Sequence, residues 1–108
     1  MALQFNQDEI KDIAYRYMEA LKAKFDIKDI YLFGSTVNGA AAGDSDIDIA
    51  VISNTFTGDR VQDTFELMRL RRGIDMRLEP HPFLEADFIQ ANPLAKEIMA
   101  TGISLLAH

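Results

Sequence analysis

The strongest constraint on the fold is the strict alternation in residues 46–51, Asp-Ile-Asp-Ile-Ala-Val. In an extended chain, successive side chains point to opposite faces, so Asp46 and Asp48 share one face while the intervening apolar side chains share the other. We therefore expect a strand with one core face and one acidic face. The two carboxylates would lie about 6 to 7 Å apart along the strand, a separation that suits a divalent cation such as Mg²⁺.

A possible phosphate-binding turn precedes this strand. Residues 29–33 form a short apolar run that predicts a buried strand ending at Gly34. Glycine allows a tight turn and lets the backbone approach a ligand closely. Ser35 follows, and its hydroxyl and backbone N–H can either cap a short helix or bind a phosphate oxygen. With the aspartate pair ten residues further on, we favour the phosphate role.

A second alternating stretch, residues 73–78, reads Gly-Ile-Asp-Met-Arg-Leu. It predicts a strand with its apolar side chains on one face and Asp75 with Arg77 on the other. If this strand lies beside residues 46–51, Asp75 joins Asp46 and Asp48. Three clustered carboxylates can hold two metal ions for in-line phosphoryl chemistry.

These residues resemble the nucleotidyltransferase superfamily with the DNA polymerase beta fold. Its pattern is Gly-Ser, ten residues, Asp-x-Asp, and a later Asp on a neighbouring strand; the matching positions are Gly34, Ser35, Asp46, Asp48 and Asp75. The size of the chain and the sequences of residues 31–35 and 43–48 most resemble those of the minimal nucleotidyltransferases, the MNT proteins. The resemblance extends over nearly the whole chain.

The resemblance implies an α+β fold (α/β-like), a small mixed β-sheet with helices packed mainly on one face. It implies transfer of a nucleoside monophosphate, AMP from ATP, to an acceptor hydroxyl with release of pyrophosphate. Asp46, Asp48 and Asp75 would be the catalytic, metal-binding carboxylates for two Mg²⁺ ions. Gly34 and Ser35 would hold the phosphates, with Arg77 as a further nucleotide-binding residue.

The minimal members of this superfamily resemble antitoxins that work with a small helical HEPN partner, whose tyrosine or other hydroxyl they can AMPylate. A partner protein as acceptor would fit a chain without an acceptor-binding domain. The alternative is a non-catalytic module of the same fold that neutralises a HEPN partner by contact. A stand-alone enzyme acting as a homodimer is a third reading.

One departure from the superfamily concerns nucleotide affinity. Many relatives carry arginines shortly after Gly-Ser, where this chain has Thr36-Val37-Asn38. Four arginines instead fall within nine residues, Arg69, Arg71, Arg72 and Arg77. They either form a solvated helix end favoured by the helix dipole or reach nucleotide phosphates or an acidic partner.

Composition limits the remaining classes. With 108 residues we expect one domain, residues 1–108. A net charge of −6 disfavours broad, salt-driven nucleic-acid binding. No apolar run is long enough to span a membrane and no signal peptide is apparent, so the expected location is cytoplasmic. The absence of cysteine excludes disulfides, thiol catalysis and a thiolate zinc site.

Helical spacing predicts the remaining elements. Asn6 should cap a first helix whose apolar stripe runs from Ile10 to Phe25. Asp59 or Gly58 should open a second helix, with Val61, Phe65 and Met68 on its core side. Asn92-Pro93 should start a last helix that ends at Gly102. We expect His81, between Pro80 and Pro82, to lie exposed in a turn.

Overall fold

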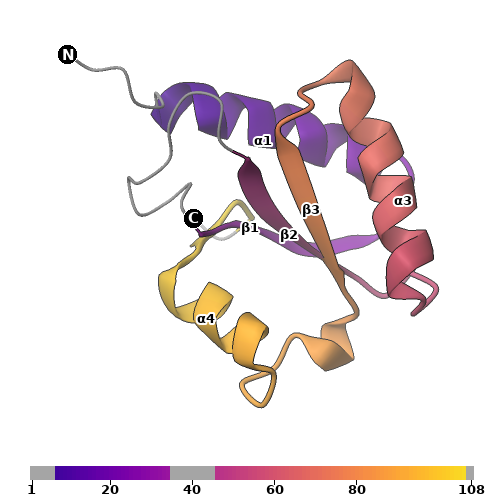
Figure 1. Cartoon of the computed structure of the whole chain (residues 1–108), viewed down its shortest axis with the longest axis vertical. Coiled ribbons are helices and arrows are strands. Elements are labelled where there is room, and N and C mark those ends of the chain that lie inside the picture. The colour runs from indigo at the N-terminus through magenta and orange to yellow at the C-terminus, as the bar shows by residue number, and fades with distance from the viewer. Residues whose placement is uncertain (1–6, 35–45, 107–108) are drawn as a thin grey trace.

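A computed structural model describes residues 7–34 and 46–106 of the chain. Its α-helices are α1 (Gln7–Lys22), α3 (Arg60–Leu70) and α4 (Pro93–Thr101). Its strands are β1 (Ile27–Leu32), β2 (Ile47–Ser53), β3 (Leu78–Phe83) and β4 (Ile103–Ser104), and short 3-10 turns, η1 and η2, occupy Arg71–Gly73 and Glu85–Asp87. Figure 1 shows α1 and α3 on one side of the strands, with α4 apart from them.

The strands form one mixed sheet in the order β3-β2-β1-β4. β1 pairs antiparallel with β2 and β4, whereas β2 and β3 are parallel. The parallel pair is possible because α3 carries the chain from the end of β2 back to the start of β3. The predicted small mixed sheet is therefore confirmed, and β2 occupies a central position in it.

Both faces of the sheet are covered, by two separate apolar clusters. The larger cluster packs α1 and α3 on the face that contains Ile47, Ile49 and Val51, which confirms the predicted core face of β2. The smaller cluster packs Ala95 and Ile98 of α4 on the other face. Because the second face is covered near the carboxyl end of β2, the acidic residues at its amino end stay partly accessible.

The first helix follows its predicted stripe closely. Its inward side chains are all nearly inaccessible: Ile10, Ile13, Ala14, Tyr17, Met18 and Leu21. The Tyr17 hydroxyl donates to the backbone carbonyl of Leu67, which ties α1 to α3. Burial raises the pKa of this phenol well above its usual range. The predicted cap at Asn6 lies outside the described residues.

The orientation of α3 differs from the prediction. Val61 is 75 % exposed and Phe65 is 70 % exposed, whereas Leu67 and Asp63 are buried. The predicted core side of this helix was therefore wrong, because Asp63 and Leu67 form the face that packs against the sheet. Asp63 accepts hydrogen bonds from the backbone N–H and hydroxyl of Thr57 and from the N–H of Gly58, so the loop before α3 folds over it.

The helix ends are as predicted in α3 and α4. The side chain of Asp59 accepts from the N–H groups of Val61 and Gln62. Asn92 caps α4 in the same manner, with Pro93 at its first position. These caps satisfy N–H groups that have no partner within a helix.

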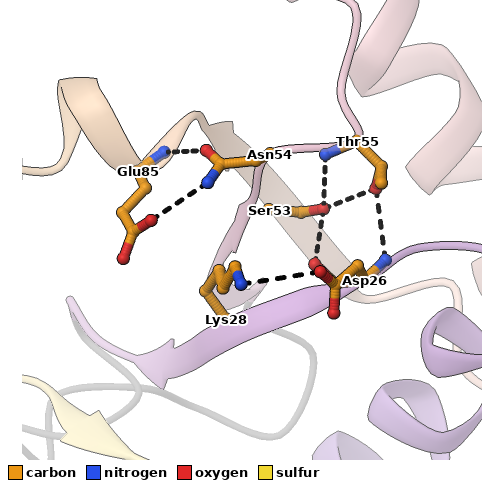
Figure 2. A network of polar contacts seen from close by, with 6 residues as sticks. All are labelled: Asp26, Lys28, Ser53, Asn54, Thr55 and Glu85. Atoms are coloured by element: carbon orange, nitrogen blue, oxygen red, sulfur yellow. Dashed lines mark hydrogen bonds and ion pairs between the residues drawn. The ribbon is translucent and has the colours of Figure 1, made fainter.

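The carboxyl end of β2 is fixed by a small polar network (Figure 2). Ser53 is fully buried, and its hydroxyl donates to the carbonyl of Asp26 at the start of β1. It also bonds the hydroxyl of Thr55, which accepts from the N–H of Asp26. Asn54 binds Glu85 through both its amide atoms. These groups satisfy one another, so we interpret the network as structural.

No helix within residues 7–34 and 46–106 is long and apolar enough to cross a membrane.

Candidate active site

The site forms where the turn after β1 meets the start of β2. Gly34 has a φ of 70°, a left-handed conformation that glycine adopts without strain. A Cβ atom added to Gly34 would lie 2.6 Å from Oδ2 of Asp48, far inside van der Waals contact. Gly34 is therefore required twice, by the backbone conformation and by the close approach of a carboxylate. Gly34 after β1 and Asp48 on β2 therefore lie against each other.

Asp46 and Asp48 lie at the amino end of β2, as their alternation predicts. Asp46 immediately precedes the strand and is exposed, while 27 % of the Asp48 side chain is exposed. The intervening Ile47 is completely buried on the opposite face. Asp48 also lies opposite Phe33, whose N–H donates to the Asp48 carbonyl over 3.2 Å. The main chain around Asp48 is thus held by a neighbouring strand.

Asp75 does not occupy the predicted position. The strand expected at residues 73–78 begins only at Leu78, because residues 71–73 form the 3-10 turn that follows α3. Met76, expected on the core face, is 58 % exposed. Asp75 therefore lies in the turn before β3 and not on the strand itself. That turn remains next to the site, since the N–H of Ile47 donates to the carbonyl of Arg77.

Asp75 and Arg77 form a forked ion pair within this turn. Oδ1 of Asp75 accepts from the backbone N–H and Nε of Arg77, and Oδ2 lies 2.8 Å from Nη2. The hydrogen bonds from the Arg77 guanidinium hold the pKa of the Asp75 carboxyl below its usual range, and the same pairing raises the pKa of Arg77. Asp75 and Arg77, both predicted as site residues, thus bind each other and stabilise the turn before β3.

Two residues that the sequence analysis did not assign lie beside Asp48. In the parallel pairing of β2 and β3, Asp48 is aligned with Glu79, and Ala50 with His81. Aligned residues on neighbouring strands point to the same face, so Glu79 stands next to Asp48 on the acidic face. Of the predicted strand, only Leu78 lies in β3, and it is buried as expected. The strand starts four residues later than Ile74, the first apolar residue of the predicted alternation.

His81 contacts Asp48 directly. Its Nε2 lies 3.5 Å from Oδ1 of Asp48, and its ring packs edge-on against Phe33 with the centroids 5.1 Å apart. Nε2 is buried and has no hydrogen-bond partner within the described part of the chain. The expectation of an exposed turn at His81 was wrong, because β3 is an edge strand that tolerates Pro80 and Pro82.

The donors at this end of the sheet fit Mg²⁺ by their chemistry. Carboxylates are its preferred protein ligands, and Mg²⁺ commonly takes only one or two of them together with nucleotide phosphates. Within residues 7–34 and 46–106, however, no three His, Asp or Glu side chains already converge on one metal position.

Part of the predicted phosphate site cannot be placed. Ser35 and the residues Thr36-Val37-Asn38, where relatives carry arginines, lie outside the described residues. Gly34 is positioned beside Asp48, as described above, and so marks where that segment leaves β1.

Comparison with known proteins assigns the chain to a family. The family described as "Polymerase beta, Nucleotidyltransferase" matches residues 16–108. The chain therefore belongs to the polymerase beta-like nucleotidyltransferases, and the predicted membership and fold are confirmed.

Individual relatives agree with this assignment. A segment of 43 residues is 46 % identical to a Methanocaldococcus jannaschii protein named "Putative protein adenylyltransferase MJ1379". The match covers 40 % of this chain and 43 % of that protein.

Two solved structures share the fold at low sequence identity. One is a Sulfolobus solfataricus protein described as a putative nucleotidyltransferase, with a TM-score of 0.65 and 20 % identity, covering 91 % of this chain and 80 % of that one. The other is a mutant form of the toxin–antitoxin MntA-HpeT, with a TM-score of 0.54 and 21 % identity, covering 96 % of this chain and 75 % of that one.

Proposed function

We propose that this protein is a Mg²⁺-dependent nucleotidyltransferase that moves AMP from ATP to an acceptor hydroxyl on a partner protein. The single observation that carries the proposal is the packing of Gly34 against the Asp48 carboxylate, with Asp46 exposed beside it. Because Gly34 has no side chain, the backbone of this turn lies against the Asp48 carboxylate, so the proposed phosphate-binding turn is next to the proposed metal ligand. Membership of the nucleotidyltransferase family and the partial match to a protein named as an adenylyltransferase support the same reaction.

In the proposed reaction, the acceptor oxygen attacks the α-phosphorus of ATP, the bond to the bridging oxygen breaks, and pyrophosphate leaves. Two Mg²⁺ ions, when bound, would neutralise phosphate charge and align the attacking and leaving oxygens. Asp46 and Asp48 would hold them, and Gly34 with Ser35 would offer backbone N–H groups to the phosphates. The acceptor proton would pass to a neighbouring carboxylate.

The third carboxylate has two candidates. Asp75 is the residue that the superfamily pattern indicates, but its oxygens are engaged by Arg77. Glu79 is aligned with Asp48 and shares its face. We propose Glu79 as the third carboxylate, because it can approach the ions without breaking an ion pair, and Asp75 with Arg77 as the clasp that closes the turn beside Ile47.

We propose a partner protein as the acceptor of the nucleotidyl group. The described residues form one four-stranded sheet with its helices. A small helical HEPN-type protein, presenting a tyrosine or other hydroxyl, fits this arrangement. The fold neighbour is a toxin–antitoxin protein, which agrees with an antitoxin role.

The test is a labelling experiment with the purified protein and a co-expressed candidate partner. ATP labelled at the α-phosphate should label the partner, and ATP labelled at the γ-phosphate should not, because the nucleotidyl group is transferred. Asp48→Asn should abolish labelling, and Glu97→Gln, an exposed change on α4, should not. Labelling from γ-labelled ATP would indicate phosphoryl transfer and overturn the proposal.

A non-catalytic module that neutralises a HEPN partner by contact is the second candidate. The pairing of Arg77 with Asp75 favours it, because this arginine is already engaged and the usual arginines after Gly34-Ser35 are missing. It requires that the partner be neutralised without ATP and that Asp48→Asn neutralise it equally well.

A further inference from the structure

Three of the five large apolar side chains that are exposed among the described residues, Val61, Phe65 and Met76, lie on or beside the outer face of α3. Val61, Phe65 and Met68 follow one another at helical spacing on this face, and Met76 lies against its end. Val61, Phe65 and Met76 are 75 %, 70 % and 58 % exposed. We refer to Val61, Phe65, Met68 and Met76, together with Arg69 and Arg72, as the α3 patch.

The patch is hollowed at its carboxyl end. A pocket of about 150 Å³ is lined by Phe65, Met68, Arg69, Arg71, Arg72 and Met76. Its lining combines apolar side chains with arginines, so it could take an apolar side chain whose acidic neighbours contact Arg69 and Arg72. Exposed aromatic and arginine side chains around a pocket are typical of the energetic centre of a protein interface.

The charge of the patch is opposite to that of the chain. The whole chain carries −6, yet four of its arginines fall between residues 69 and 77. Arg72 is exposed and makes no hydrogen bond or ion pair with the described residues, and Arg69 makes only a surface pair with Glu66. Arg69 and Arg72 are therefore available to carboxylates of a partner, because binding would break at most one weak surface ion pair.

The patch also lies at the catalytic end of the sheet. The chain leaves α3 through η1 and passes Met76 immediately before Arg77, whose carbonyl bonds Ile47 between Asp46 and Asp48. The patch and the aspartate pair therefore lie toward the same end of the sheet but on opposite sides of it, since α3 covers the face that contains Ile47. Figure 1 shows α3 beside α1 on that side of the strands.

We propose that the α3 patch is the docking surface for a protein partner that presents apolar side chains flanked by carboxylates. Nucleic acid does not fit, because its phosphates would leave the central apolar side chains uncovered in an otherwise acidic chain. The inference rests on the proposed function only in supposing that a protein partner exists. It places that partner's contact apart from the nucleotide site.

The test is selection of peptides from a random display library on the immobilised protein without ATP or Mg²⁺. Enriched peptides should combine apolar residues with Asp or Glu, and their titration should shift amide resonances of α3 and residues 71–76. Phe65→Ser and Arg72→Glu should each weaken binding about tenfold or more. Ile89→Ser and Arg60→Glu are matched exposed controls and should leave the affinity unchanged.

Three results would overturn the proposal: no enrichment, enrichment of peptides without acidic residues, or resonance shifts away from α3. Self-association of the chain that Phe65→Ser abolishes would assign the patch to a second copy instead, and size-exclusion chromatography detects it. Since the selection contains no nucleotide, failure of the docking proposal and failure of the transferase proposal are separate outcomes.

Discussion

Oδ1 of Asp48 lies 3.5 Å from the buried Nε2 of His81, while Oδ2 faces the backbone of Gly34. The two oxygens of one carboxylate are therefore confined from two directions, by the strand on one side and by the turn on the other. Groups behind a metal ligand fix its orientation and commonly affect metal affinity about 10- to 100-fold. In the proposed metal site, this arrangement would give His81 a positioning role that the sequence pattern did not indicate.

Replacing His81 should lower the Mg²⁺-dependent affinity for ATP without lowering the free energy of unfolding. His81→Phe keeps a ring against Phe33 but removes Nε2, and we expect Mg²⁺-dependent ATP affinity to fall about tenfold. The free energy of unfolding should not fall, because a buried nitrogen without a hydrogen-bond partner is removed. His81→Gln retains a donor and should recover most of the affinity. Calorimetry and urea denaturation measure the two quantities, and a parallel loss of both would reduce His81 to a packing role.

Gly34 should be intolerant of any side chain. Gly34→Ala would place a Cβ at a φ of 70° and 2.6 Å from Oδ2 of Asp48. We expect a loss of about 1 to 2 kcal/mol of unfolding free energy from the left-handed conformation, together with loss of Mg²⁺-dependent binding. Gly73→Ala is the matched control, because a Cβ there meets nothing within 4 Å. Equal behaviour of the two variants in urea denaturation would contradict the assigned role of Gly34.

Glu79 and Asp75 can be separated by isosteric substitution. Glu79→Gln removes the charge aligned with Asp48, so we expect Mg²⁺ affinity in the presence of ATP to fall at least about tenfold. Asp75→Asn should lower the affinity less, because it weakens only the clasp with Arg77. Titration of both variants by calorimetry decides between them. A larger effect of Asp75→Asn would return Asp75 to the metal site and exclude Glu79.

The Asp75–Arg77 clasp should make stability depend on acid pH. Pairing with Arg77 lowers the pKa of Asp75 in the folded protein. The stabilisation is therefore complete above the unfolded aspartate pKa of about 3.9 and is lost as the pH falls through the lower folded value. The difference in unfolding free energy between the wild type and Asp75→Asn should be constant near neutrality and shrink below about pH 4. A difference that does not change with pH would show that the ion pair does not contribute.

Much of this fold can be predicted from local patterns. Side-chain alternation correctly assigns the core face of β2, and helical spacing correctly assigns that of α1. The caps at Asp59 and Asn92 follow from residue type. The errors arise where tertiary contacts override local pattern. The side chain of Asp63 is buried by three hydrogen bonds from its own loop, and this turns Phe65 outward.

The site was less predictable than the fold, for a related reason. Which residue stands beside Asp48 depends on the register between β2 and β3, and register is not encoded in either strand alone. The two prolines of β3 concealed a strand, because proline is tolerated only where the strand edge is open. An alternation that continues from Asp75 through His81 was the available signal for Glu79.

The most direct test of the central claim is calorimetric titration of the purified protein with ATP, with and without Mg²⁺, for the wild type and Asp48→Asn. The account predicts binding that requires Mg²⁺ and is lost in the variant, while urea denaturation shows that the variant remains folded. Binding that is independent of Mg²⁺, or that persists unchanged in a folded Asp48→Asn variant, would contradict it.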